Sequence, residues 1–372
     1  MRIIQRAVGQ IELRRMPWAL VVVALALTCV GALFITSAHS YTLGVKHLVF
    51  SGVGLVAFLC MTLFDYRHFA GVSLHLYILG VASLAALPFF GVTVNNARRW
   101  YDLGVVHMQP SEPMKLLLII ALAEYFAYRR ESHGLRSIIP PLILTLVPML
   151  LIARQPDFGT AMMLAPVFAV MAFIGKVRLR TLGILSAAGV ILLAAVWFAP
   201  GVLKPYQRSR LKSFIDPKAN PHSSASYNAR QATLAISSGG LHGQGWARGR
   251  LNRLGRIPER HTDFIFPVIA EEWGFWKSSL VISLYLVIIA LLARITMQSR
   301  DRFGKLIAGG VLALFASQSL MHLAIALRLA PITGLTLPLV SYGGSSLVTI
   351  FAAFGLASSV AIRKSIVFSE DR

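Results

Sequence analysis

Long apolar runs alternate with short polar segments along most of this 372-residue chain. A helix needs about 20 mostly apolar residues to cross the ~30 Å hydrocarbon core of a bilayer. The runs that approach this length lie at residues 17–37, 45–64, 71–91, 112–128, 137–153, 159–175, 180–199, 268–293, 304–327 and 342–362. This pattern predicts an all-α integral membrane protein of about ten transmembrane helices, forming a single domain over residues 1–372.

The composition agrees with a membrane location. Hydrophobic residues make up 56% of the chain and charged residues only 14%, which is more apolar surface than a soluble domain of this length can bury. Cys29 and Cys60 both lie inside apolar runs, so the sequence indicates neither a disulfide framework nor cysteine metal ligands. A soluble enzyme is therefore not expected.

The distribution of Lys and Arg predicts the orientation. An even number of spans places both termini on one side, and Lys and Arg concentrate in the segments of that side. Positive charge favours the cytoplasmic face, so we expect both termini to be cytoplasmic. The first apolar run is longer than the core of a typical signal peptide, and we expect it to be retained as an anchor.

One long loop, residues 200–262, then lies on the outer side. It is strongly basic, with Asp216 and Glu259 as its only acids, which indicates either attraction to anionic lipid or binding of a diphosphate. Few aromatic residues are available for stacking, so nucleic acid is not an expected partner. Tyr227–Ile236 predicts a short amphipathic helix, and the glycine-rich segment Ser237–Trp246 is typical of tight turns or of an anion-binding backbone.

The segment Pro258–Phe266 places Asp263 at the foot of the eighth apolar run. Ionisable groups at a membrane are costly and are often functional, so Asp263 is the first candidate for catalysis. Burial beside Phe264 and Phe266 would raise its pKa from ~3.9, whereas a nearby cation would lower it, and the sequence leaves both possible. Pro267 is expected to delay or kink the helix that follows.

Other polar residues lie at the ends of predicted spans. Glu112 and Lys115, spaced i, i+3, favour an ion pair that orients the fourth span. Two roles are open for Asp157: it caps the N-terminus of the sixth span, or it converges with Asp263 to bind one cation or share one proton. The irregular stretch 331–346 indicates a cavity wall, because non-helical backbone at membrane depth must be covered by protein or line a water-filled cavity.

Together these segments resemble the SEDS family of membrane proteins (shape, elongation, division and sporulation), and the resemblance covers nearly the whole chain. The matching motifs are Gln109-Pro110-Ser111-Glu112, Gln155-Pro156-Asp157-Phe158-Gly159-Thr160, His261-Thr262-Asp263-Phe264-Ile265-Phe266 followed by Glu271-Glu272, Pro331-Ile332-Thr333-Gly334 and Ser341-Tyr342-Gly343-Gly344-Ser345. The form Pro258-Glu259-Arg260-His261 is more similar to the family's elongation member than to its division member.

The resemblance implies a peptidoglycan glycosyltransferase that polymerises lipid II at the outer face of the bacterial cytoplasmic (inner) membrane. It also implies a class B penicillin-binding protein as transpeptidase partner, the elongation machinery, and contact with membrane lipid. On this basis Asp263 matches the family's essential aspartate, acting as a base or as a ligand of a divalent cation such as Mg²⁺ or Mn²⁺ together with Asp157. The candidates for contact with the undecaprenyl-diphosphate substrate are Arg208, Arg210, Arg99, Lys115, Glu112 and Ser341.

Three alternatives stay open at this point. A lipid II flippase would account for a polar cavity among the spans, although the sequence shows no obvious inverted repeat. A scaffold that only holds a penicillin-binding protein would tolerate loss of Asp263. The division polymerase of the same family would share the chemistry and differ in its partners.

Overall fold

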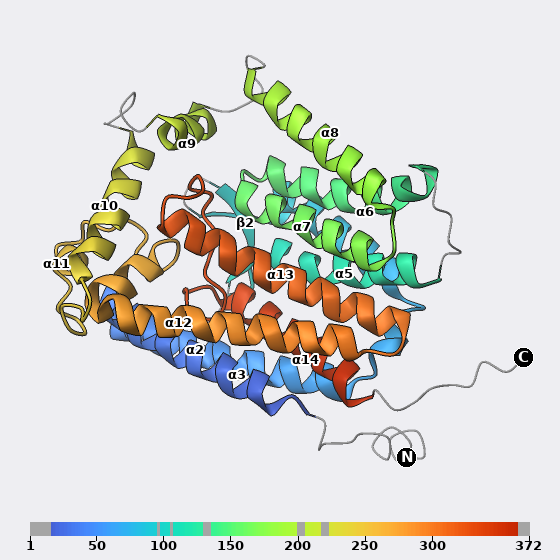
Figure 1. The fold of residues 1–372 in the computed structure, drawn as a ribbon, viewed down its shortest axis with the longest axis horizontal. Helices are drawn as coiled ribbons and strands as arrows, with labels where there is room; N and C mark the ends of the chain where they lie inside the picture. The colour runs from blue at the N-terminus through green and yellow to red at the C-terminus, as the bar shows by residue number, and fades with distance from the viewer. Residues whose placement is uncertain are drawn as a thin grey trace, which may run out of the picture.

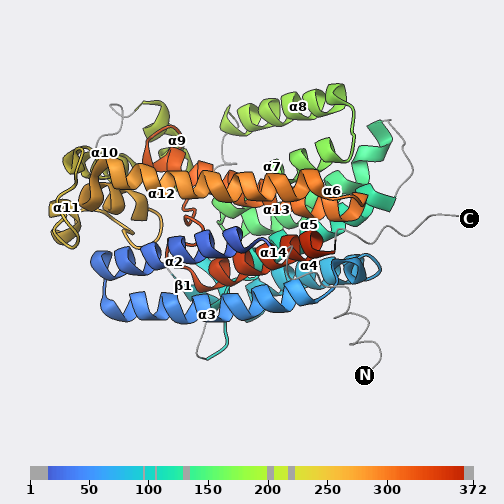
Figure 2. The same cartoon turned by 60° about the horizontal axis from the view of Figure 1, so that its bottom comes forward.

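The computed structural model describes residues 16–94, 97–104, 107–128, 135–198, 205–216 and 223–363. Most of these residues are helical, and the long helices run roughly side by side (Figures 1 and 2). The elements are α2 (Trp18–Ala38), α3 (Tyr41–Leu63), η2 (Tyr66–Phe69), α4 (Ser73–Phe90), β1 (Val92–Val94), β2 (Ala97–Asp102), β3 (His107–Met108), α5 (Ser111–Tyr128), α6 (Leu135–Arg154), α7 (Phe158–Ile174), α8 (Leu179–Phe198), α9 (Pro205–Ile215), α10 (Ser224–Gly239), α11 (Arg250–Arg253), α12 (Ile265–Gln298), α13 (Arg302–Ala326) and α14 (Gly344–Ile362).

Each of the ten predicted runs coincides with one of these helices, and the all-α membrane class is confirmed. Within the described residues, seven helices are long and apolar enough to cross a membrane, namely α2, α3, α4, α6, α12, α13 and α14. Helix α7 is apolar but shorter, and α5 includes Glu112, Lys115 and Glu124 among its 18 residues. The predicted amphipathic helix at Tyr227–Ile236 is also confirmed, as the central part of α10.

Helix α13 lies at the centre of the bundle, where it packs on α5, α7, α12 and α14, while α3 runs along α14. Apolar residues such as Leu306, Leu314 and Phe354 are fully buried between these helices. Helix α8 stands at the edge of the bundle (Figure 1). Large apolar side chains on α3, α4 and α8 are exposed, as expected for helices that face lipid.

Helix α12 is broken within the predicted eighth span. The backbone at Gly274 adopts φ 71° and ψ −174°, which is not helical. The expectation that Pro267 would delay or kink the start of the helix was wrong: α12 begins at Ile265, and Pro267 lies in its first turn, where its missing N–H has no helical partner to lose. The break is instead at glycine, the residue that adopts positive φ without strain.

The glycine-rich loop 237–246 docks into this break. Phe275 N–H donates to Gly240 O at 2.9 Å, and Gly245 N–H donates to Glu272 O at 2.9 Å. A Cβ on Gly274 would lie 2.2 Å from Gly243 N. The glycines therefore allow loop and helix backbones to touch, so the structure gives them a packing role.

The irregular segment between α13 and α14 enters the bundle with its backbone hydrogen-bonded. Its carbonyl groups accept hydrogen bonds from side chains of the surrounding helices: Leu335 O from His322 Nδ1 at 2.8 Å, Pro338 O from Tyr285 Oη at 2.5 Å, and Leu339 O from His47 Nε2 at 3.2 Å. Thr336 O accepts from Gln318 at 3.1 Å. Polar groups in otherwise apolar helices thus satisfy a non-helical backbone inside the bundle.

Candidate active site

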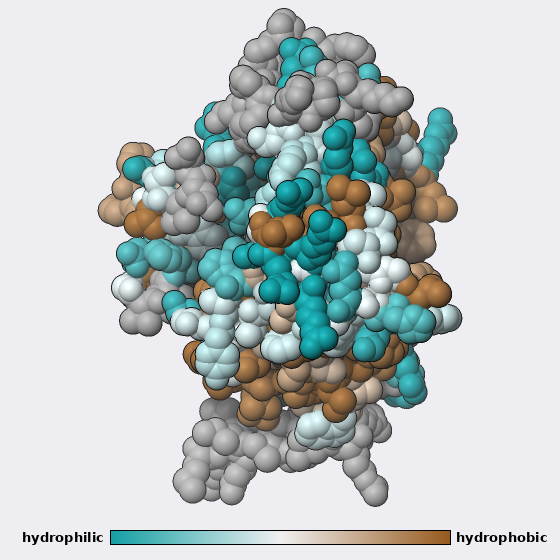
Figure 3. All heavy atoms as spheres, turned by 90° about the vertical axis from the view of Figure 1, so that its left-hand side faces the viewer, coloured by the Kyte–Doolittle hydropathy of each residue, from teal (hydrophilic) through white to brown (hydrophobic). Residues whose placement is uncertain are grey.

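Asp263 lies immediately before α12, at the end of the bundle that carries α10 and α11 (Figures 1 and 2). Phe264 and Phe266 are buried and anchor this turn, while the side chain of Asp263 keeps partial exposure. In the view onto this end, hydrophilic side chains gather across the centre of the face, and hydrophobic side chains are exposed lower in the same view (Figure 3). Asp263 itself is partly exposed and is followed in the chain by the buried Phe264.

The surroundings of Asp263 raise its pKa to about 7, chiefly because its partial burial reduces the solvation of the charged carboxylate. The negative charges of Glu259 and Asp157 act in the same direction. The guanidinium groups of Arg210 and Arg99 oppose the shift. The two effects that the sequence left open are thus both present, and desolvation is the larger. A carboxylate with this pKa is suited to accept a proton near neutral pH.

The irregular segment holds the backbone next to Asp263. Ser341 Oγ donates to Thr262 O at 2.6 Å and accepts from Leu337 N–H at 2.8 Å. Tyr342 N–H donates to His261 O at 2.9 Å. Ser341 is buried, with its hydroxyl engaged in both directions, so the structure places it behind Asp263 rather than facing a substrate.

Asp157 caps α7, as one of the two readings of the sequence predicted. Its Oδ1 accepts from Thr160 N–H at 3.2 Å and its Oδ2 accepts from Gln109 Nε2 at 2.8 Å. Burial raises the pKa of Asp157, and the charge of Arg99 opposes that shift. The carboxylate is buried, and its effect on the pKa of Asp263 shows that the two acids belong to one electrostatic site.

Arg99, on β2, joins this site to the turn that precedes α7. Its Nε donates to Gln155 O at 2.9 Å, a second nitrogen donates to Pro156 O, and a third lies 4.0 Å from Asp157. Arg99 lies at a register shift of the antiparallel pair β1–β2, between the paired residues Arg98 and Trp100. Its side chain is 29% exposed, which leaves part of the guanidinium accessible.

Glu112 and Lys115 form the ion pair that their spacing predicted. Lys115 Nζ lies 2.9 Å from each carboxylate oxygen of Glu112 and donates to Gln318 Oε1 at 3.2 Å. The two side chains are 7% and 1% exposed, respectively. Since Gln318 also bonds to Thr336 of the irregular segment, the pair connects α5, α13 and that segment and has little surface for direct substrate contact.

Arg208 and Arg210 both lie on α9 and are half-buried. Arg210 reaches across to the irregular segment, where a guanidinium nitrogen donates to Ile332 O at 3.4 Å. The charge of Arg210, like that of Arg99, also lowers the pKa of Asp263. Within the described part of the chain, no contact places Arg208 at this site.

The protein groups do not build a complete metal site. No group of three or more His, Cys, Asp or Glu that could hold an ion occurs among the described residues. Each oxygen of Asp157 accepts one hydrogen bond and keeps a second lone pair, so the metal-ligand role of Asp157 stays a prediction. Asp263 fits a cation only as one ligand of an ion held mainly by substrate phosphates, which is a common arrangement for Mg²⁺.

Reasoning from sequence did not single out Glu259 or Gln318. Glu259 influences Asp263 through its charge, and its place four residues upstream was an available signal. Gln318 stood as an isolated amide in a long apolar run, which is often a sign of an interior hydrogen bond.

The fold and this site define a polytopic membrane protein with a partly buried acid at one end of the bundle, and comparison with known proteins identifies the family. The family model for the cell cycle proteins FtsW, RodA and SpoVE matches residues 16–366. The chain therefore belongs to this family, the SEDS family.

The similar proteins include relatives named MrdB and FtsW. The peptidoglycan glycosyltransferase MrdB of Escherichia coli is 33% identical over 343 residues, which are 92% of each chain. The probable peptidoglycan glycosyltransferase FtsW of Bacillus subtilis is 35% identical over 319 residues, which are 83% of this chain and 78% of the relative.

Two solved structures share the fold. RodA of Thermus thermophilus superposes with a TM-score of 0.72 at 27% identity, covering 95% of this chain and 98% of that chain. A chain from a study of a peptidoglycan synthase complex that coordinates polymerization and crosslinking gives a TM-score of 0.80 at 31% identity, covering 93% and 97%.

Proposed function

We propose that this protein polymerises lipid II into β-1,4 glycan strands for cell elongation. As a SEDS member with relatives named peptidoglycan glycosyltransferases, the chain is itself a peptidoglycan glycosyltransferase. The observation that carries the proposed mechanism is the position of Asp263, a carboxyl group with a pKa of about 7 at the edge of the apolar bundle.

In the proposed reaction, the carboxylate of Asp263 accepts the proton of the acceptor sugar's 4-hydroxyl group. The hydroxyl oxygen forms a bond to the anomeric carbon of the donor as the bond from that carbon to the diphosphate breaks. Undecaprenyl diphosphate leaves with the electron pair, and the α-linked donor gives a β-linked product. A base with a pKa near the working pH combines a useful fraction of carboxylate with enough basicity to assist proton transfer.

Arginines support departure of the diphosphate in this scheme. Arg210 acts on Asp263 and lies against the irregular segment, and its fork suits phosphate oxygens. Arg208 and Arg99 are proposed to add positive charge near the bound diphosphate. A divalent cation such as Mg²⁺ or Mn²⁺ is proposed to arrive with the diphosphate and neutralise its charge, with Asp263 as its protein ligand.

The proposed role in elongation rests on the sequence Pro258-Glu259-Arg260-His261, which is more similar to the family's elongation member than to its division member. Relatives named for elongation and for division have similar identities to this chain, so identity does not distinguish the two roles. The proposed location is the bacterial cytoplasmic membrane, with both termini in the cytoplasm. The proposed partner is a class B penicillin-binding protein, consistent with the polymerization and crosslinking named for a structural neighbour.

The test is polymerisation of lipid II by the purified protein with and without its cognate penicillin-binding protein. Asp263→Asn keeps the shape of the side chain but removes the base, and the rate is expected to fall by at least ~10²-fold. Asp102→Asn, at an exposed acid on β2, is the matched control and should behave as wild type. Equal strand formation by Asp263→Asn would refute the assignment, and lipid transport without strands would favour the flippase.

A further inference from the structure

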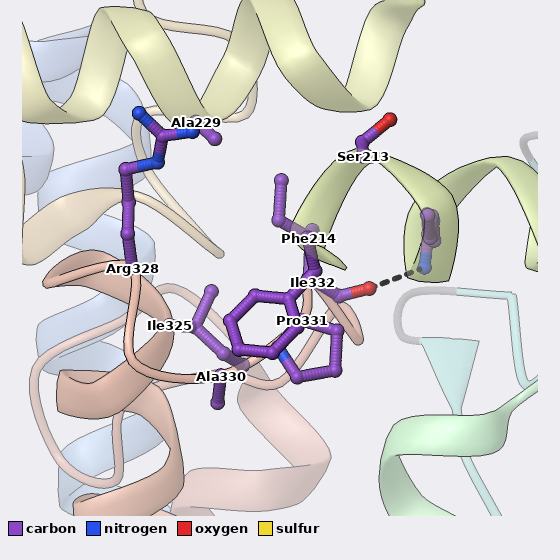
Figure 4. Close-up of a pocket in the computed structure, with 9 residues that line it drawn as sticks. Ser213, Phe214, Ala229, Ile325, Arg328, Ala330, Pro331 and Ile332 are labelled. Atoms are coloured by element: carbon purple, nitrogen blue, oxygen red, sulfur yellow. Dashed lines mark hydrogen bonds between the residues drawn. The ribbon is translucent and has the colours of Figure 1, made fainter. Parts of the chain in front are cut away.

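A cavity of about 250 Å³ lies beside the candidate active site, between α9, α10 and the end of α13. Figure 4 shows Ser213 and Phe214 on α9, Ala229 on α10, and Pro331 and Ile332 on the irregular segment around this space. Pockets for drug-sized ligands usually measure ~300–1,000 Å³. This cavity therefore suits part of an amphiphile, such as a head group and the first atoms of its chain.

The lining combines positive charge with apolar surface. Among the described residues that line it, the charged ones are Arg210 and Arg328 and none is acidic. Phe214, Ile325 and Pro331 supply apolar contact. A phosphate attached to a hydrocarbon chain matches both properties, because Arg binds phosphate oxygens through two donors and the apolar wall accepts the chain.

Arg328 occupies a backbone position that usually favours glycine. Its φ is 59°, and it follows α13 in a Schellman turn, in which Arg328 N–H donates to Ile325 O at 3.1 Å and Leu329 N–H donates to Ala324 O at 2.7 Å. The left-handed conformation is unfavourable for a residue with a side chain, and glycine is the usual residue at this position. Strain of this kind concentrates at functional sites.

The side chain of Arg328 extends along the cavity toward α10 (Figure 4). Among the residues that the structure describes, its guanidinium has no hydrogen-bond or ion-pair partner, although the residue is half-buried. A helix C-terminus attracts cations in general, but that attraction does not explain an arginine aimed over a cavity.

We propose that this cavity binds the phosphate head of a membrane amphiphile, with Arg328 and Arg210 as its two cationic walls. Arg210 connects it to the reaction site, because the same side chain influences Asp263 and bonds to Ile332 O. Under the proposed function the amphiphile is the prenyl diphosphate end of a substrate or product. The alternative source of the same chemistry is a bulk anionic phospholipid, which the test separates.

Arg328→Gly is the decisive variant, because glycine is the preferred residue in this turn and the fold should be retained or stabilised. The matched control is Lys176→Gly. Lys176 has φ 62° in the same turn after α7, with Lys176 N–H bonded to Phe173 O and Val177 N–H to Ala172 O. It lies near Arg302, at the start of α13 and so at the opposite end of that helix, and does not line the cavity.

Binding of undecaprenyl diphosphate, phosphatidylglycerol and inorganic pyrophosphate would be measured in detergent by native mass spectrometry and titration. Arg328→Gly should weaken binding of one or both lipids about tenfold or more, and Lys176→Gly should not. The lipid whose binding is weakened by Arg328→Gly is the amphiphile that the cavity binds. Unchanged lipid binding by Arg328→Gly, or pyrophosphate binding as tight as that of the lipids, would overturn the proposal.

The same variants separate this inference from the proposed function. If Asp263→Asn abolishes polymerisation while Arg328→Gly binds lipid as wild type, the cavity proposal fails alone. If wild type makes no strands but its lipid binding depends on Arg328, the polymerase proposal fails and the phosphate site stands.

Discussion

The hydroxyl of Ser341 donates a 2.6 Å hydrogen bond to the carbonyl oxygen of Thr262, the residue directly before Asp263. Because the same hydroxyl accepts from Leu337 N–H, it ties the irregular segment to the acid's own turn. Segments almost 80 residues apart in sequence thus share the task of placing one carboxylate, with Ser341 as a positioning residue.

Ser341→Ala is expected to reduce the polymerisation rate roughly ten- to a hundredfold, because a small displacement of the base is costly to catalysis. The pH at half-maximal rate should also shift, since Asp263 would leave its present surroundings. Ser283→Ala provides the control, because Ser283 is exposed and bonds only within its own helix. A variant that melts earlier but keeps the wild-type rate and pH profile would assign Ser341 a purely structural role.

The rate of polymerisation by wild type should rise with pH through about 7, as Asp263 loses its proton. Asp157→Asn removes a negative charge that raises the pKa of Asp263, and Asn still caps a helix. Its rate profile should therefore move to lower pH. The measurement is the initial rate of polymerisation between pH 5 and 9. If the pH–rate profile of Asp157→Asn coincides with that of wild type, a group other than Asp263 controls the rise of the rate with pH.

The raised pKa of Asp263 also predicts a pH-dependent stability difference. The unfolded chain releases this proton near ~3.9 and the folded protein near 7, so between these values the folded state binds more protons and its stability falls as pH rises. Asp263→Asn should consequently melt at a higher temperature than wild type at pH 8. The difference should vanish near pH 4, and a constant difference across this range would contradict the assigned pKa.

Replacing one partner of the buried Glu112–Lys115 ion pair should destabilise the protein more than replacing both. Lys115→Met leaves Glu112 charged and unpaired in the bundle, with an expected loss of about 3–5 kcal/mol. The double variant Glu112→Gln with Lys115→Met should recover much of that stability. Thermal unfolding in detergent tests this order. A double variant that is stable yet inactive would restore the direct substrate role predicted from sequence.

Gly274→Ala should detach the glycine-rich loop from α12, because φ is 71° and the new Cβ would approach Gly243 N to 2.2 Å. Hydrogen exchange is expected to accelerate at the amides of Gly245 and Phe275, which bridge the two segments. Gly52→Ala is the matched control, since an added Cβ there meets nothing within 4 Å. Equal exchange in both variants would refute the packing role of Gly274.

The sequence by itself determined the class of this protein and its helices. A bilayer dictates the length and apolarity of a spanning segment, so all ten predicted runs could be located without tertiary contacts. Asp263 could be selected for the same reason, because an acid at the foot of an apolar run has no ordinary place in lipid. The caps and spacings at Asp157, Glu112 and Lys115 are local rules that one segment decides alone.

Only the tertiary structure decided what surrounds these residues. The break at Gly274 depends on a loop some 30 residues upstream, and the role of Ser341 depends on the carbonyl of Thr262. The pKa of Asp263 reflects opposing charges from α9, β2 and the start of α7 together with burial. Electrostatic effects on a pKa depend on the distances between charges and on how far water is excluded. Neither the distances nor the exclusion of water is known until the helices are packed.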